Sequence, residues 1–184
     1  MCIRDREKLV HIYIFDFSDN VLDEITDTRW KDRHPAWSPD GETLAFVRKI
    51  ATTEIWLVDK SGLSPERFSG ATVKYYNYPA WSFDGKILFY TEQSSEGGLP
   101  YFSGKRIEDG GLPLEFRIPP TGNTDISPAV EMDVSPDGAW MVFEHWPEGT
   151  NHDIYIANIN GANLKQLGNG QSFEFGPKWQ PSNP

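Results

Sequence analysis

One short pattern recurs along the chain, and this repeat restricts the possible folds more than any other feature. An apolar or aromatic residue is followed by Ser-Pro-Asp-Gly, or a close variant, and then by a short apolar run. Copies occupy residues 34–41, 78–85 and 132–138, and a partial copy lies at 176–181. Proline presets φ at the second position of a tight turn, and glycine accepts the positive φ that follows. Each copy therefore predicts two strands joined by a turn.

The spacing of the copies gives the length of the repeat. Trp37, Trp81, Val134 and Trp179 precede the turns and are separated by 44, 53 and 45 residues. Periods of about 40–45 residues with four short strands are typical of β-propeller blades. We therefore predict an all-β fold, a partial β-propeller of four-stranded antiparallel blades. The predicted full blades lie at 34–77, 78–128 and 129–175, and partial blades at 7–33 and 176–181.

Two segments depart from the repeat. The longer middle interval predicts an insertion of about nine residues, which we place within 93–111. The charged hexapeptide 1–6 lacks the apolar centre of a signal peptide, and we expect it to be a non-native leader. The chain would then be the C-terminal part of a larger ring, in which 176–181 supplies a closing inner strand.

Composition argues against several function classes. The chain has 17 Lys and Arg against 27 Asp and Glu, a net charge of -10, which would repel a phosphate backbone, so no nucleic-acid partner is predicted. The single cysteine, Cys2, allows no internal disulfide. No apolar run reaches the length of a membrane span. Because nucleotide-binding, nucleophile and zinc-protease motifs are missing from the sequence, we predict no cofactor, no metal site and no catalytic residue.

Several conspicuous residues recur in successive repeats, which favours a structural role because a catalytic residue is needed only once. An alternative for the aspartates is metal or acid–base chemistry, and for the tryptophans a stacking surface for sugars. The predicted structural turn residues are Ser38, Pro39, Asp40, Gly41, Ser82, Asp84, Gly85, Ser135, Pro136, Asp137 and Gly138. The residues predicted to pack between blades are Trp37, Trp81 and Trp179.

Four residues are candidates for binding a ligand or partner. His34 and Tyr78 occupy the same place in two successive repeats, at the start of a predicted inner strand. Inner strands line the central channel of a propeller, so we expect both side chains to face a ligand there. His145 and His152 flank a short loop that contains Glu148. Converging ligands of this kind could hold a metal ion, although surface histidines on a polar loop are the commoner explanation.

The repeats resemble the blades of TolB-type, WD-like propellers. The resemblance rests on Pro-Ala-Trp-Ser-Pro-Asp-Gly at 35–41, Asp-Ile-Tyr-Ile at 153–156 and Asn-Gly-Ala-Asn-Leu-Lys-Gln-Leu at 160–167. It extends over residues 9–181 and implies a ring of six blades, of which this chain would be a fragment. It also implies a periplasmic or exported protein that acts as a non-catalytic scaffold for a protein or peptide partner.

Similar blades occur in proteins of other functions, and two alternatives stay open. The chain could be the propeller part of a larger hydrolase, peptidase or lyase whose catalytic part lies elsewhere. It could also be a carbohydrate-binding propeller that holds a glycan or another small molecule at the channel mouth. For the scaffold function, the insertion at 93–111 is the most individual loop and a predicted contact site.

Overall fold

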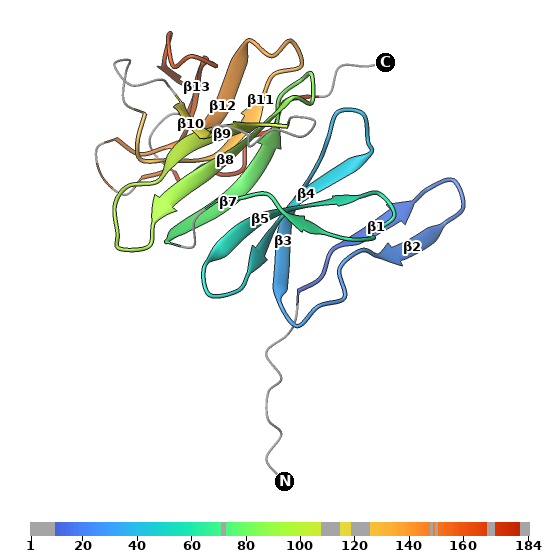
Figure 1. Cartoon of the computed structure of the whole chain (residues 1–184). Helices are drawn as coiled ribbons and strands as arrows, with labels where there is room; N and C mark the ends of the chain where they lie inside the picture. Colours follow the sequence, from blue (N-terminus) through green and yellow to red (C-terminus); the bar gives the residue numbers. More distant parts are fainter. Residues whose placement is uncertain are drawn as a thin grey trace.

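The structure is a computed structural model, and it describes residues 10–70, 73–107, 115–118, 126–147, 149, 151–168 and 172–180. These residues form β-strands and connections, without a helix (Figure 1). A search of the described residues accordingly finds no helix long and apolar enough to cross a membrane. The predicted all-β class is confirmed.

The described residues form three four-stranded antiparallel sheets, each from consecutive strands of one repeat, which confirms the predicted four-stranded antiparallel architecture. Blade 1 comprises β3 (Lys31–Trp37), β4 (Thr43–Lys49), β5 (Thr53–Asp59) and β6 (Glu66–Arg67). Blade 2 comprises β7 (Lys74–Trp81), β8 (Ile87–Ser94), β9 (Tyr101–Arg106) and β10 (Glu115–Ile118). Blade 3 comprises β11 (Ala129–Val134), β12 (Trp140–His145), β13 (Asp153–Asn158) and β14 (Lys165–Gln166). A hairpin of β1 (Tyr13–Asp16) and β2 (Val21–Glu24) precedes them.

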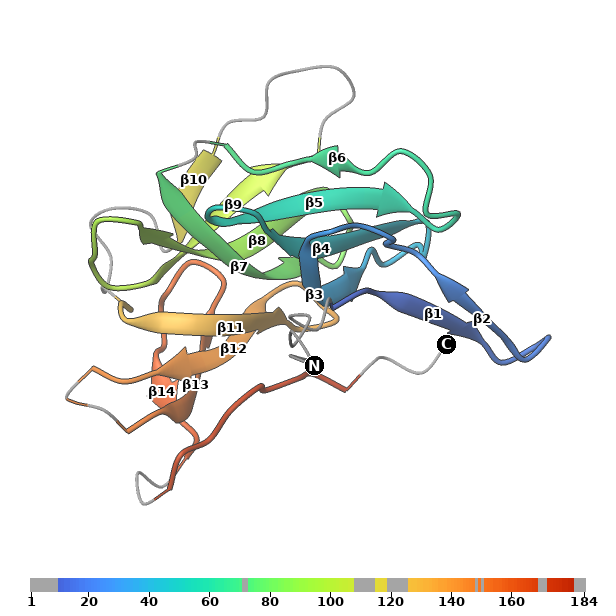
Figure 2. The ribbon, with the colours of Figure 1, turned by 90° about the horizontal axis from the view of Figure 1, so that it is seen from below.

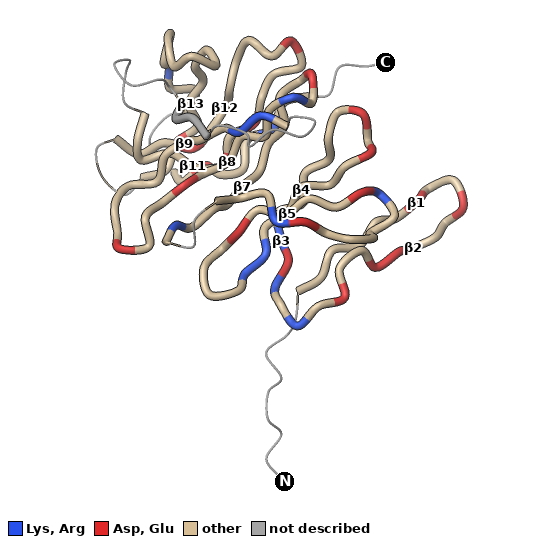
Figure 3. The backbone as a smooth tube through the Cα atoms, viewed as in Figure 1, with Lys and Arg blue, Asp and Glu red and all other residues tan. Residues whose placement is uncertain are grey.

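The first strand of each blade is its inner strand. β7 contacts both β3 and β11, so the inner strands of adjacent blades lie side by side and the other strands extend away from them (Figure 2). β3 and β7 begin at Lys31 and Lys74, a few residues before the predicted blade starts at 34 and 78. Acidic residues are spread over the hairpin and the blades, without collecting on one of them (Figure 3).

Apolar layers fill the spaces between neighbouring sheets. Successive residues of a strand point to opposite faces, and β4 shows the consequence. Leu44 and Phe46 pack toward the β1–β2 hairpin, whereas Ala45 and Val47 pack toward blade 2. All four side chains are at most 1% exposed. The continuous apolar run in the sequence therefore reflects a strand that is buried on both faces.

The recurrent turn is closed by a compact set of hydrogen bonds. The Ser38 hydroxyl donates to Asp40 Oδ1 at 2.6 Å and accepts from the backbone N–H of Thr43 at 2.9 Å. The Ser38 hydroxyl and the backbone N–H of Glu42 hold the pKa of Asp40 below its usual value. Gly41 has a φ of 72°, as the turn requires. The same serine–aspartate contact occurs at Ser82–Asp84 and Ser135–Asp137.

Tryptophans link neighbouring blades through their indole groups. Trp81 Nε1 donates to the carbonyl of Ala36 at 2.9 Å, one blade earlier. Trp179 Nε1 donates to the carbonyl of Asp133 at 3.2 Å, and Asp133 likewise lies one repeat earlier in the chain. The prediction that Trp37 is also covered is wrong, because its side chain is 42% exposed. Within the described residues no inner strand precedes β3, so Trp37 has no equivalent surface to pack against.

The additional length of blade 2 is divided between several connections. Residues 95–100 join β8 to β9, where blade 1 uses only 50–52. Ten residues separate β10 from β11, whereas six separate β6 from β7. The predicted insertion at 93–111 therefore contains only part of the additional length. Residues 108–111 of that segment lie outside the described residues.

A buried ion pair ties the two ends of the first hairpin of blade 1 together. Arg48 donates from Nε and Nη2 to the two carboxylate oxygens of Asp32, both at 2.8 Å. The side chains are 6% and 0% exposed. The guanidinium also lies over the rings of Phe46 and Trp56, at 5.2 and 4.6 Å from their centroids. Both charged groups are thus removed from water, and each is stabilised by the opposite charge of the other.

We expect Asp32→Ala to destabilise the protein by about 3–5 kcal/mol, because it leaves the Arg48 guanidinium buried without a counterion. The exposed pair Lys60–Glu42, 2.7 Å long and about 60% exposed on each side chain, provides the control. Lys60→Ala should cost less than about 1 kcal/mol. Urea unfolding of both variants measures the difference, and equal costs would contradict the proposed dependence.

Candidate functional site

A β-bulge interrupts the inner strand of each blade at the same place. β3 pairs Arg33 with Val47 and Ala36 with Ala45, so two residues of β3 face a single residue of β4. Equivalent register shifts occur between Asn77 and Ala80 on β7, and between Val130 and Asp133 on β11. A bulge bends the strand and redirects one side chain. Here it turns the first residue of each bulge away from the packed faces of the blades.

These first bulge residues share an unusual backbone conformation. His34, Tyr78 and Glu131 have φ values of 51°, 52° and 54°. Few non-glycine residues adopt the left-handed region, and they cluster at functional sites. Gly176, three residues before Trp179, has a φ of 58° and occupies the same position in the last copy of the repeat. We call these four residues the ring positions.

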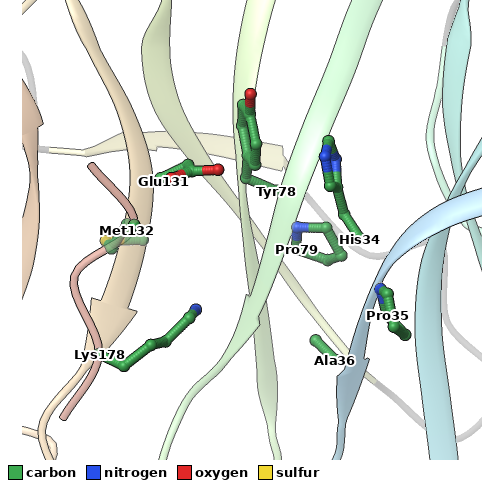
Figure 4. A pocket seen from close by; sticks show the side chains of 9 residues that line it. His34, Pro35, Ala36, Tyr78, Pro79, Glu131, Met132 and Lys178 are labelled. Atoms are coloured by element: carbon green, nitrogen blue, oxygen red, sulfur yellow. The ribbon is translucent and has the colours of Figure 1, made fainter.

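The ring positions converge on one cavity of about 180 Å³, which we call the ring cavity. In Figure 4 the His34 and Tyr78 rings lie next to one another, and the Glu131 carboxyl group points toward Tyr78. The remaining lining residues are Pro35, Ala36, Pro79, Met132 and Lys178. Apolar walls therefore surround a small number of polar groups, the usual composition of a ligand site.

His34 and Tyr78 form one wall of the ring cavity. Their rings are stacked, with centroids 4.5 Å apart and planes inclined by 23°. Burial, and to a smaller extent the charge of Arg33, lowers the pKa of His34, so its ring is neutral at pH 7. Burial also raises the pKa of Tyr78. His34 Nδ1 is buried and has no hydrogen-bond partner among the described residues, so it is available to a ligand.

Glu131 lines the opposite wall, and the buried Glu144 is hydrogen-bonded to it. Burial raises the pKa of Glu131 to about 7, and a hydrogen bond with Glu144 together with the charge of Glu144 adds to this effect. Glu144 is 3% exposed and accepts the backbone N–H of Gly176 at 2.9 Å. Its other oxygen lies 3.1 Å from His152 Nδ1. Since two adjacent carboxylates repel one another, Glu144 helps to keep the Glu131 carboxyl group protonated up to about pH 7.

A second cavity of about 500 Å³ adjoins the ring cavity and shares His34 and Tyr78 with it. Its other lining residues are Arg33, Asn77, Thr91, Gln93, Pro100, Val130 and Trp146. Thr91 is 4% exposed, and its hydroxyl has no hydrogen-bond partner among the described residues. A buried hydroxyl left unpaired costs about 1–3 kcal/mol. We call this second space the amide cavity, after Asn77 and Gln93.

The two histidines of the predicted 145–152 site lie in different surroundings. His145 is 3% exposed, and its Nδ1 lies 2.8 Å from the carbonyl oxygen of Pro128, so its side chain is not presented to a partner. His152 stacks on Trp146, with ring centroids 4.0 Å apart. Glu148 lies outside the described residues. No three His, Cys, Asp or Glu side chains of the described part are grouped to hold a metal ion.

Two of the ring positions were not found from the sequence. Glu131 and Gly176 lie three residues before Val134 and Trp179, as His34 and Tyr78 lie three residues before Trp37 and Trp81. Counting back from the residue before each turn would have found them. The signal is weak because Glu131 is followed by Met132, whereas His34 and Tyr78 are each followed by proline.

Comparisons with known proteins identify the fold. No family model matches the chain. The Tol-Pal system protein TolB of Zymomonas mobilis is 36% identical over 50 residues, which are 26% of this chain and 11% of that protein. The crystal structure of TolB from Acinetobacter baumannii superposes with a TM-score of 0.67 and 24% identity, over 85% of this chain and 37% of that one. The chain has the TolB-type β-propeller fold.

The TolB-type fold is shared with proteins of other functions. An oligogalacturonate lyase from Vibrio parahaemolyticus superposes with a TM-score of 0.60 and 18% identity, over 85% of this chain and 42% of that one. This chain therefore spans less than half the length of both the TolB and the lyase structures. The partial propeller predicted from the repeats is confirmed.

The carboxyl pair of this TolB-type propeller predicts a pH dependence of stability. The pKa of Glu131 is about 7 in the folded state, above its usual value of 4.5, so folding favours the protonated form. This contribution is complete below pH 4.5 and is lost as the pH rises to about 7. The free energy of unfolding should therefore decrease between pH 5 and pH 7.5 in the wild type, and it should decrease less in the Glu131→Gln variant.

Urea unfolding at a series of pH values provides the measurement. Glu66→Gln, at an exposed position on β6, is the matched control and should leave the pH dependence of the wild type unchanged. If the free energy of unfolding depends on pH in the same way for the Glu131 variant and the wild type, the pKa of Glu131 is not raised in the folded protein.

Proposed function

We propose that the chain is a non-catalytic scaffold that binds a protein or peptide partner at the ring positions. The observation that carries this proposal is the bulge, which presents different side chains at one repeated backbone position. The turn serines and aspartates are the same in successive copies, whereas the ring positions hold His34, Tyr78, Glu131 and Gly176. Such variation is expected where a rigid scaffold displays a binding surface.

The two adjoining cavities fit an extended segment of a partner. The ring cavity is small and mostly apolar, and the amide cavity offers the side-chain amides of Asn77 and Gln93. Amide groups can pair with the donors and acceptors of a peptide backbone. The likeness to TolB, a protein of the Tol-Pal system, supports a protein partner. By the same likeness we propose a periplasmic or exported location.

The charge of the chain adds a preference for a basic partner. A net charge of -10 attracts a positively charged surface over a distance that salt shortens. The association rate should therefore fall as the ionic strength rises. The predicted contact segment 93–111 contributes Gln93 and Pro100 to the lining of the amide cavity, which supports a partner contact there.

A glycan-binding or lyase-related function is the second candidate. It is favoured by the likeness to the Vibrio oligogalacturonate lyase and by the aromatic side chains of Tyr78 and Trp146 in the amide cavity. Aromatic faces stack against sugars, and amides pair with hydroxyl groups. Binding of an oligosaccharide on a glycan array, lost on Tyr78→Ala, would favour this candidate over the scaffold.

Selection of peptides from a random phage-displayed library tests the scaffold function. We expect selected peptides to bind the wild type and to lose at least about tenfold in affinity on His34→Ala combined with Tyr78→Ala, because the stacked wall is removed. Phe17→Ala, at a 90% exposed site on the hairpin, is the control and should bind as the wild type does. Failure to select any peptide, or equal binding by both variants, would overturn the proposal.

A further inference from the structure

Resting on the proposed function, we propose that the ring cavity selects a positively charged side chain of the bound peptide. The ammonium group of a lysine or the guanidinium group of an arginine would pair with Glu131 and lie against the stacked rings of His34 and Tyr78. This assigns a specificity to the scaffold that the fold alone does not provide.

Among the described residues, no lysine or arginine forms an ion pair with Glu131 or Glu144. Glu131 lines the cavity from its bulge, and Glu144, which is 3% exposed, is hydrogen-bonded to it. Glu144 also accepts the N–H of Gly176 at 2.9 Å and lies 3.1 Å from His152 Nδ1. Two carboxyl groups so close need a positive charge or a proton between them. A cationic ligand would take the place of the proton, which passes to solvent.

The opposite wall accepts a cation. The rings of His34 and Tyr78 are stacked 4.5 Å apart, and the face of an aromatic ring attracts an ammonium or guanidinium group. Burial lowers the pKa of His34, so this wall carries no positive charge at pH 7. The unpaired Nδ1 of His34 is an additional acceptor or donor for the ligand, according to its tautomer.

Lys178 is the protein cation that could compete for Glu131. It lines the ring cavity, but its side chain is 69% exposed and its Nζ lies 3.8 Å from Asp133 Oδ1. Its charge only partly opposes the effect of burial on the pKa of Glu131. His34, Tyr78, Glu144 and Lys178 are the described titratable groups near Glu131, from β3, β7, β12 and the C-terminal segment. Lys178 is therefore too exposed to neutralise the pair.

The amide cavity gives independent support for a ligand at this place. Thr91 lines this cavity of about 500 Å³ and is only 4% exposed. Its hydroxyl group has no hydrogen-bond partner among the described residues. A peptide backbone that passes Asn77 and Gln93 would supply that partner. Since both cavities share His34 and Tyr78, one extended segment can occupy the amide cavity and place a long side chain in the ring cavity.

Cation binding must therefore be linked to a proton. In the free protein the pKa of Glu131 is about 7, so the carboxyl group is mostly protonated at pH 6 and mostly ionised at pH 8. A cation binds the ionised form, which is about tenfold more populated at pH 8 than at pH 6. The affinity should rise by that factor over this range, and binding near pH 6 should release a proton.

Titration with side-chain analogues tests the inference without a selected peptide. We expect n-butylammonium and n-butylguanidinium to shift the NMR signals of His34 and Tyr78, about tenfold more tightly at pH 8 than at pH 6. The neutral analogue 1-butanol should not. Glu131→Gln should abolish the preference for the cations and its pH dependence, and Glu66→Gln, on exposed β6, should retain both.

The outcomes separate this inference from the proposed function. Cation binding that is equal in the Glu131→Gln variant, or the same shifts with 1-butanol, would overturn the inference. So would the absence of any shift with either cation. If selected peptides still depend on His34 and Tyr78 in that case, the scaffold function stands without the cation preference. If cations bind as expected but no peptide is selected, the scaffold function fails and the cation site remains.

Discussion

Burial of both faces of each blade is the constraint on which the structure depends. A strand such as β4 places Leu44 and Phe46 on one face and Ala45 and Val47 on the other, and all four are buried. A single four-stranded sheet cannot cover both of these faces, so each blade requires a neighbour on each side. The blades therefore pack face to face with their inner strands side by side. The bulges of these strands then line the same cavity.

The inner-strand bulge separates the chemistry of the site from the stability of the blades. The side chains before and after the bulge pair within the sheet, whereas the first bulge residue points into the ring cavity. His34, Tyr78 and Glu131 share nearly the same φ but differ in charge, shape and hydrogen bonding. The scaffold therefore holds different residues at this position, and they give the ring cavity its chemical character.

The sequence predicts the architecture well because the turn is local. Serine, proline, aspartate and glycine define the turn through hydrogen bonds within a few residues, so each copy can be recognised without its neighbours. His34 and Tyr78 were predicted to face the channel because each stands before a proline in a clear copy. Glu131 stands in a copy without that proline. The pairing of Glu131 with Glu144, the burial of His145 and the exposure of Trp37 depend on which strands lie opposite, which a single sequence does not specify.

Gly176 gives the ring one position without a side chain. Its φ of 58° matches the other ring positions, and a Cβ atom placed there would lie 3.4 Å from Glu131 Oε2. The volume of the cavity and the environment of the carboxyl pair are therefore controlled from one residue that no blade needs for its packing. A substitution at this single site would narrow the cavity or add a charge to it. Propellers with nearly the same blades can therefore differ in the ligands that they bind.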